Sequence, residues 1–263
     1  MQVIRINGVH LHYRRRGPAD APTVVFANSL GTDLRIWDGV LDQLGEGIQS
    51  LCYDKRGHGL SDAPPAPYTL DDHIGDLAGL LTHEAIHKAV LCGVSVGGMI
   101  ALGLAARRPA TVRALILCDT AHRIGSDQLW NERIDLIRRH GIESMADPIL
   151  ERWFSEAFRR ADPQAVAGWR NMLVRTPVDG YVGTCAALRD ADLTTAARAL
   201  KLPVRCLAGS EDGATPPSLV KSMSELIPGS RFQVVQGAGH LPCIEAPRDM
   251  AGVIAEIVKE HAS

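Results

Sequence analysis

Residues 89–106 read AVLCGVSVGGMIALGLAA, and this stretch decides the fold. The apolar run Ala89–Cys92 is typical of a buried parallel strand, and Met99–Ala106 is typical of a helix. Between them lies Gly93–Gly97, in which Ser95 is flanked by two glycines, a pattern that predicts a sharp strand-to-helix turn. Such a turn needs small neighbours and projects the serine hydroxyl beside the free N–H groups of a helix N-terminus. We therefore expect Ser95 to be a nucleophile; the alternative is a glycine-rich turn with an incidental serine.

The composition of the chain is that of one globular domain. With 263 residues, it is long enough for a large α/β domain with a substantial core. Its 46% hydrophobic and 22% charged residues are typical of a soluble protein. A net charge of −2 argues against nucleic acid or an anionic membrane as a partner. No apolar run approaches the roughly 20 residues of a membrane span, and we expect no signal peptide.

The cysteines and motifs predict neither disulfides nor a cofactor. Four of the six cysteines lie in apolar, strand-like runs, and no pair has CxxC spacing. We interpret them as buried free thiols of a cytoplasmic protein. The chain has no His/Cys cluster with zinc-ligand spacing, no GxGxxG fingerprint and no GxxxxGK[ST] loop. We therefore expect no metal and no organic cofactor.

Alternating apolar strands and helices predict a mainly parallel, eight-stranded sheet with helices on both faces. The expected strands are Val3–Ile6, Val9–Arg14, Thr23–Ala27, Ser50–Tyr53, Ala89–Cys92, Val112–Cys118, Val204–Ala208 and Phe232–Val235. Further helices are expected at Trp37–Leu44, at Thr69–Thr82 with Thr69 as N-cap, and over an apolar stripe from Met250 to Val258.

The alternation breaks between residues 122 and 200. This segment shows helical stripes, no convincing strand and three of the four tryptophans. We expect residues 122–200 to form a helical cap inserted into an α/β core of residues 1–121 and 201–263. The alternative is a helical subdomain whose tryptophans only fill its own core.

A nucleophilic serine needs a base, and His240 is the best-placed histidine. It follows the last expected strand through a loop with two glycines, at the edge of the sheet where ligands bind. The base in turn needs an acid. Asp212, just beyond Val204–Ala208, fits the chain order Ser–Asp–His. Asp119, directly after Cys118, is the rival, and the side chain of Glu211 should point elsewhere.

Attack on a carbonyl also needs hydrogen-bond donors for the developing oxyanion. The backbone N–H of Val96, next to the nucleophile, is the first expected donor. The second should come from the loop after Thr23–Ala27, where we expect the N–H of Leu30.

With these residues placed, the chain resembles the α/β-hydrolase superfamily over nearly its full length, including a Tyr53–Asp62 loop that shapes the floor of the site. Within it, the chain is most similar to the 3-oxoadipate enol-lactonases. The segments that carry this likeness are Ala27–Leu34 with Trp37, Ala63–Thr69, Cys118–Ser126 with Trp130 and Arg133, and Arg152–Phe154. The chain departs from the family at Val94 and Val96, where those lactonases usually have Leu and Met around the serine.

The resemblance implies a cofactor-free hydrolase that opens a lactone ester in aromatic-compound catabolism. Its substrate would carry a free carboxylate, which Arg133 or Arg152 could bind, with Trp153 in the pocket wall. For each arginine the alternative is a solvent-facing side chain. Other functions stay open on the same scaffold: a carboxylesterase, a carbon–carbon bond hydrolase, or a non-enzymatic ligand sensor. The sequence predicts no oligomeric state.

Overall fold

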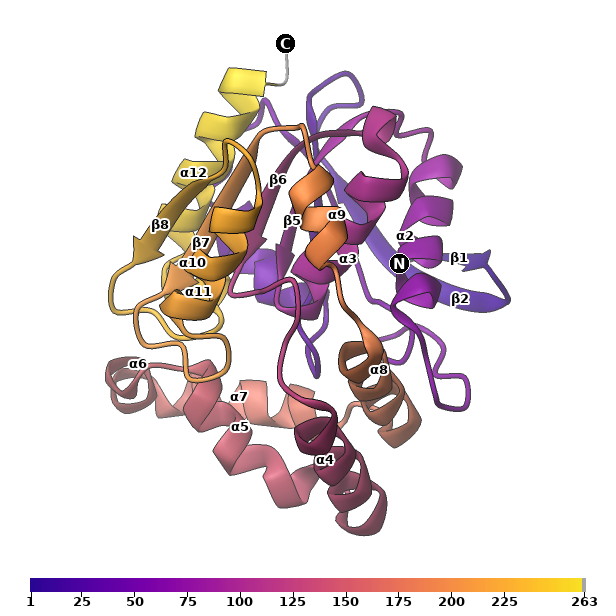
Figure 1. Cartoon of the computed structure of the whole chain (residues 1–263), viewed down its shortest axis with the longest axis vertical. Coiled ribbons are helices and arrows are strands. Elements are labelled where there is room, and N and C mark those ends of the chain that lie inside the picture. Colours follow the sequence, from indigo (N-terminus) through magenta and orange to yellow (C-terminus); the bar gives the residue numbers. More distant parts are fainter. Residues whose placement is uncertain (262–263) are drawn as a thin grey trace.

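The computed structural model describes residues 1–261 and contains one eight-stranded sheet (Figure 1). Its strands are β1 (Gln2–Ile6), β2 (Val9–Arg16), β3 (Thr23–Ala27), β4 (Gln49–Tyr53), β5 (Ala89–Val94), β6 (Val112–Cys118), β7 (Val204–Gly209) and β8 (Arg231–Val235). They are ordered β1-β2-β4-β3-β5-β6-β7-β8. Only the β1–β2 and β2–β4 pairs are antiparallel. The predicted mainly parallel sheet is confirmed, with each strand within two residues of its expected bounds.

The strand register aligns the carboxyl ends of the parallel strands. Ala27 of β3 pairs with Gly93 of β5, and Cys118 of β6 pairs with Leu207 of β7. The loops that follow β3, β5, β6, β7 and β8 therefore all leave the sheet at one edge, which is where ligands bind in open α/β sheets.

Among residues 1–261, twelve helices accompany this sheet, and those outside the cap region cover its two faces. They are α1 (Asp38–Leu41), α2 (Leu70–His83), α3 (Val96–Arg107), α4 (Asp127–His140), α5 (Ala146–Trp153), α6 (Glu156–Ala161), α7 (Pro163–Val174), α8 (Val178–Asp190), α9 (Thr194–Ala199), α10 (Pro217–Leu226), α11 (Pro242–Glu245) and α12 (Pro247–His261), with short 3₁₀ turns at Leu34–Trp37, Pro109–Thr111 and Ile142–Met145. Helices α1 and α12 pack together, and α2, α3, α9 and α10 form another contiguous layer. Because both faces are covered, β3 to β6 are almost wholly buried, and most of their residues are apolar.

Local signals explain where helices begin. Thr69 caps α2 as predicted: its hydroxyl accepts the N–H of Asp72, and the Asp72 carboxylate accepts the N–H of Thr69. The prediction of one helix over Trp37–Leu44 is wrong. The Asp33 carboxylate accepts the N–H of Arg35 and starts a 3₁₀ turn earlier, so the segment divides into this turn and the four-residue α1.

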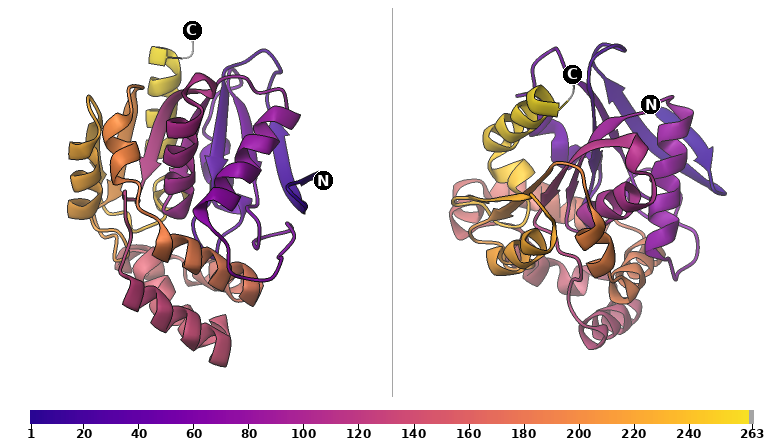
Figure 2. Two further views of the ribbon diagram at one scale, coloured as in Figure 1. Left: turned by 45° about the vertical axis from the view of Figure 1, so that its right-hand side comes forward. Right: turned by 45° about the horizontal axis from the view of Figure 1, so that its top comes forward.

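Five helices, α4 to α8, lie together across the end of the sheet from which those loops leave (Figures 1 and 2). All come from the predicted insertion, residues 122–200, which contains no strand. The last helix of that segment, α9, packs against α3 instead. We use "cap" for α4–α8 below.

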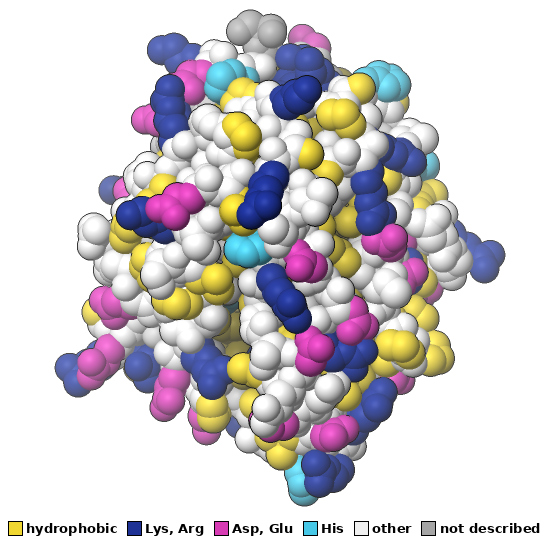
Figure 3. Space-filling view, viewed as in Figure 1, with side chains coloured by type: hydrophobic (Ala, Val, Ile, Leu, Met, Phe, Trp, Pro, Cys, Tyr) yellow, Lys and Arg dark blue, Asp and Glu magenta, His cyan; other side chains and the backbone are white. Residues whose placement is uncertain are grey.

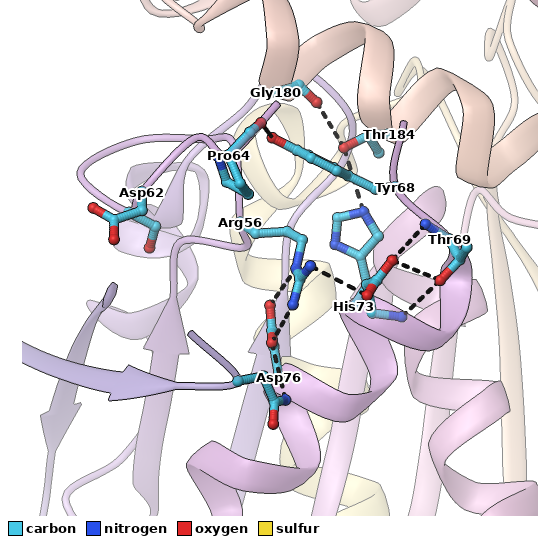
Figure 4. A network of polar contacts seen from close by, with 12 residues as sticks. Arg56, Asp62, Pro64, Tyr68, Thr69, His73, Asp76, Gly180 and Thr184 are labelled. Atoms are coloured by element: carbon cyan, nitrogen blue, oxygen red, sulfur yellow. Dashed lines mark hydrogen bonds and ion pairs between the residues drawn. The ribbon is translucent and has the colours of Figure 1, made fainter. Parts of the chain in front are cut away.

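The loop after β4 ties the cap to the core (Figure 4). Arg56 in this loop donates two hydrogen bonds of 2.7 Å to Asp76 of α2. Next to it, Gly57 touches Gly180 at the start of α8 so closely that a Cβ on residue 180 would lie 1.9 Å from the Gly57 carbonyl oxygen. Two glycines thus allow direct backbone contact between loop and cap.

Burial and surface agree with the composition. All six cysteines are buried free thiols, as predicted for four of them, whereas the compartment stays a prediction. Within residues 1–261, no helix has the length and apolarity needed to cross a membrane. On the face drawn in Figure 3, acidic and basic side chains are interspersed, which fits the near-neutral net charge.

Candidate active site

Ser95 lies at the turn between β5 and α3, with φ 58° and ψ −122°. This is a strained conformation for a residue with a side chain. Two hydrogen bonds hold it: its N–H donates to the Cys118 carbonyl at 3.0 Å, and its own carbonyl accepts the Thr120 hydroxyl at 2.6 Å. A Cβ on Gly97 would lie 2.1 Å from the Ala27 carbonyl oxygen, and one on Gly93 would lie 2.3 Å from that of Gly97. Both glycines are therefore required by the turn.

His240 enters the site from the loop after β8. Its backbone N–H donates to the Trp153 carbonyl of the cap at 2.8 Å. Its Nδ1 lies 2.9 Å from the Asp212 Oδ2 atom. Since a carboxylate only accepts, Nδ1 carries the proton, and Nε2 is left as an acceptor. Nε2 faces the cavity, where it lies 3.5 Å from the Ser29 hydroxyl. No hydrogen bond joins His240 to the Ser95 hydroxyl among residues 1–261; the imidazole is anchored through Nδ1 and lines the same cavity as Ser95.

The Asp212 carboxylate is surrounded by donors. Oδ1 accepts the backbone N–H groups of Ala214 and Thr215, at 2.7 and 3.0 Å. Oδ2 accepts the Thr215 hydroxyl at 2.6 Å as well as the His240 ring. Burial alone would raise the pKa of Asp212, but His240 and these hydrogen bonds hold it below its usual value. Asp212 is therefore ionised, whereas neighbouring Glu211 is exposed to solvent.

Asp119, the alternative acid, lies close to Asp212 and His240 but accepts fewer hydrogen bonds than Asp212. Its Oδ1 accepts the Gly209 N–H at 2.8 Å. One carboxyl oxygen each of Asp119 and Asp212 and one ring nitrogen of His240 lie within 4.8 Å of one another. Asp212, not Asp119, makes the direct hydrogen bond to the imidazole.

The predicted oxyanion donors lie beside the serine. Neither the Leu30 N–H nor the Val96 N–H donates to another residue within 1–261. Two residues of the loop after β4 stabilise the loop that carries Leu30. The Gly31 N–H donates to His58 Nε2 at 3.0 Å, and the buried Lys55 side chain donates to the Ser29 carbonyl. These contacts fix the loop that presents Leu30.

One cavity joins the serine, the histidine and the cap. It has a volume of about 90 Å³. Its lining includes Ser95, His240, Leu30, Arg133, Arg152 and Trp153, six of the eight residues predicted for the site. Val96 and Asp212 are not part of the lining. Val96 follows Ser95 in the chain, and Asp212 is hydrogen-bonded to His240, and both Ser95 and His240 line the cavity.

The cavity contains positive charge that no protein carboxylate neutralises. Among residues 1–261, no carboxylate lies within ion-pair distance of Arg133 or Arg152. The Arg133 guanidinium lies 5.0 Å from the centre of the Trp130 ring, which is fixed by a 2.7 Å hydrogen bond to the Ile124 carbonyl. Arg133 is partly buried and Arg152 is exposed, so Arg133 is the better-held cation.

Some residues of the site were missed by sequence reasoning. They are Thr215, which contacts His240, and Tyr181, which lines the cavity near Arg133. Thr215 lies three residues after Asp212, a spacing typical of side-chain-to-backbone turns, so it had a local signal. Tyr181 lies inside a cap helix and had none.

Comparison with known proteins identifies the family of the chain. The family model described as alpha/beta hydrolase fold matches residues 22–247. The chain is 33% identical to 3-oxoadipate enol-lactonase 2 of Acinetobacter baylyi over 251 residues, 95% of this chain and 94% of that protein. The crystal structure of the enol-lactonase from Burkholderia xenovorans LB400 superposes with a TM-score of 0.95 at 35% identity, covering 98% of this chain and 100% of that one. A malate-bound thermophilic esterase from Thermogutta terrifontis gives 0.93 at 28% identity, covering 99% of each chain. This chain belongs to the α/β-hydrolase fold family.

Proposed function

We propose that this protein is a serine hydrolase that opens 3-oxoadipate enol-lactone to 3-oxoadipate, with Ser95, His240 and Asp212 as its catalytic triad. The likeness to enol-lactonases over nearly the whole chain supports the substrate class. The short hydrogen bond between His240 and Asp212 supports the triad. The observation that carries the proposal is that Ser95, His240 and two unneutralised arginines line one small cavity.

The proposed reaction begins at the lactone carbonyl. His240 Nε2 removes the hydroxyl proton as Ser95 Oγ forms a bond to the carbonyl carbon. The N–H groups of Val96 and Leu30 stabilise the oxyanion, each by about 3 kcal/mol. Asp212 stabilises the imidazolium that forms.

Collapse of the tetrahedral intermediate breaks the ring C–O bond. The oxygen that leaves is that of an enol, and it takes the proton from His240. The enol then tautomerises to a ketone. Because the ring is opened, not divided, the whole substrate stays attached to Ser95 as an ester. A water molecule, deprotonated by His240, hydrolyses this ester and restores the Ser95 hydroxyl.

Arg133 would bind the free carboxylate of the substrate. Its charge faces the cavity, and stacking on Trp130 limits its freedom before the substrate arrives. A cavity of about 90 Å³ favours a compact substrate over a long acyl chain. The likeness to a Thermogutta terrifontis esterase supports simple ester hydrolysis as the second candidate function.

Steady-state kinetics on two substrates test this proposal. We expect kcat/KM to be far higher with the enol-lactone than with p-nitrophenyl acetate, which has no carboxylate. Arg133→Met should lower kcat/KM for the enol-lactone by about 10- to 100-fold, mainly through KM. It should affect p-nitrophenyl acetate much less.

The matched control is Arg138→Met, which removes an exposed arginine from the same helix and should change neither substrate's kinetics. Equal losses with both substrates, or no loss from Arg133→Met, would contradict the anchor. Turnover of p-nitrophenyl acetate without turnover of the enol-lactone would favour the esterase.

A further inference from the structure

A second carboxyl group lies beside the proposed triad with half of its hydrogen-bonding capacity unused. Asp119 is 0% exposed and directly follows β6. Its Oδ1 accepts one backbone N–H, from Gly209, whereas its Oδ2 is buried and has no hydrogen-bond partner among residues 1–261. Buried carboxyl oxygens are normally paired, so this atom calls for an explanation.

The location of Asp119 explains its unpaired oxygen. It comes from β6 and Asp212 follows β7, and these strands are neighbours in the sheet. As a result, a carboxyl oxygen of Asp119 lies within 4.8 Å of both an Asp212 oxygen and a ring nitrogen of His240. Two buried carboxylates this close repel each other, which favours the protonated form of one of them.

The hydrogen bonds decide which of the two carries the proton. Asp212 accepts four, from Ala214, Thr215 twice and His240, which together stabilise its negative charge. Asp119 accepts a single one. Burial and the nearby charge of Asp212 raise the pKa of Asp119 well above its usual range. Asp119 is therefore a neutral acid with an O–H group to donate.

We propose that Asp119 is a positioning residue of the active site, which supports the Asp212 carboxylate in the intact protein and takes its place beside His240 when Asp212 is removed. The proposal rests on the proposed function of Ser95, His240 and Asp212. In the intact site the Asp119 carboxyl group lies next to the charged Asp212 carboxylate. Without Asp212, the charge that kept Asp119 protonated is gone, so Asp119 can ionise and stabilise the imidazolium.

The titratable groups that face Asp119 are few. They are Asp212 and His240 from the loops after β7 and β8, Cys118 from its own strand, and Cys243 of α11. Burial raises the pKa of both thiols well above the usual range, so they stay neutral in the pH range of the assay. Loss of Asp212 is therefore the change that alters the charge next to Asp119.

A double-mutant cycle tests the proposal on four proteins: wild type, Asp119→Asn, Asp212→Ala, and the double variant. The readout is the rate at which a fluorophosphonate labels Ser95, with p-nitrophenyl acetate hydrolysis alongside. Neither probe requires recognition of a lactone. Asp119→Asn should slow labelling of the wild type by about 2- to 5-fold. In the Asp212→Ala background the same substitution should slow it by 10-fold or more.

A pH profile separates this role from a merely structural one. The labelling rate falls at acidic pH as His240 takes up a proton. The double variant lacks the last carboxylate beside His240, so the midpoint of this fall should lie about one pH unit lower than in Asp212→Ala. A packing role would leave the midpoint where it is. Glu245→Gln is the matched control, because it neutralises another, partly buried acid near this loop and should have the same effect in both backgrounds.

Equal effects of Asp119→Asn in the two backgrounds, with an unmoved midpoint, would overturn the proposal. If Asp212→Ala does not fold, as judged by circular dichroism, the cycle is repeated with Asp212→Asn, which preserves the side-chain volume. Absence of labelling at Ser95 in the wild type would contradict the proposed function itself. The two failures are thus distinguishable.

Discussion

Individual residues of this protein hold positions that stability alone would not favour. Ser95 has a positive φ, at a cost of about 1 to 3 kcal/mol. Lys55 is only 1% exposed and donates to the Ser29 carbonyl of the loop that presents Leu30. Both features lie where the proposed oxyanion site is built, so backbone strain and a buried amine are found next to the residues of the proposed reaction.

Lys55 should make stability depend on pH. Burial, opposed by Asp54 and Asp33, lowers its pKa from 10.5 to about 7. Between these values the unfolded chain binds the proton and the folded chain does not, so this group makes the folded state more stable as pH rises. The wild type should therefore gain stability relative to Lys55→Met from pH 7 to pH 10, by at most about 1.4 kcal/mol per pH unit.

Urea unfolding of both proteins at several pH values checks this. Lys88→Met, which removes an exposed lysine, is the control and should track the wild type. A constant difference between wild type and Lys55→Met across pH 7 to 10 would contradict the expected loss of the proton on folding.

At the scale of elements, local sequence patterns predicted the positions of the strands and the start of helix α2. All eight strands were expected, since their apolar runs are bounded by turns, and the N-cap of α2 was predicted at Thr69. Asp212 and His240 could be predicted to lie close together because each follows a strand that ends at one edge of the sheet, and they share a hydrogen bond. Lys55 and Asp119 show the limit: nothing in the local pattern says that the first is buried or that the second has an unpaired oxygen.

The close backbone contact between the β4 loop and α8 should make the protein sensitive to any side chain at residue 180. In Gly180→Ala the new Cβ would lie 1.9 Å from the Gly57 carbonyl oxygen, so α8 must move away from the core. Since α8 carries Tyr181 of the cavity wall, kcat/KM should fall about 10-fold and the melting temperature should drop. Calorimetry and steady-state kinetics measure both. Gly168→Ala, with open space at its Cβ, is the control; equal behaviour of the two variants would contradict close packing at residue 180.

At the scale of the whole molecule, Glu245 joins the His240 loop to the cap. Its Oε1 accepts the Gly239 N–H at 2.8 Å, and its Oε2 accepts the Ser155 hydroxyl at 2.6 Å and N–H at 3.1 Å. Together with the bond from the His240 N–H to Trp153, this ties the proposed base to the cap through backbone groups.

Loss of the Glu245 hydrogen bonds should lower the stability of the protein and impair catalysis. Glu245→Ala leaves buried donors without an acceptor, so we expect about 1 to 3 kcal/mol lower stability, with KM raised. Glu245→Gln, which can still accept, should retain most of both. Urea unfolding with steady-state kinetics measures this, and Glu256→Ala, at an exposed position of α12, is the control. Wild-type stability of Glu245→Ala would show that the link is unimportant.

The central claim concerns the whole arrangement: the turn after β5 presents Ser95 as the nucleophile toward a lactone carbonyl in the cavity under the cap. The most direct measurement is kcat/KM for 3-oxoadipate enol-lactone with the wild type and with Ser95→Ala. We predict efficient turnover by the wild type and a loss of at least about 10³-fold in Ser95→Ala. Turnover by a folded Ser95→Ala protein within 10-fold of the wild type would contradict the account.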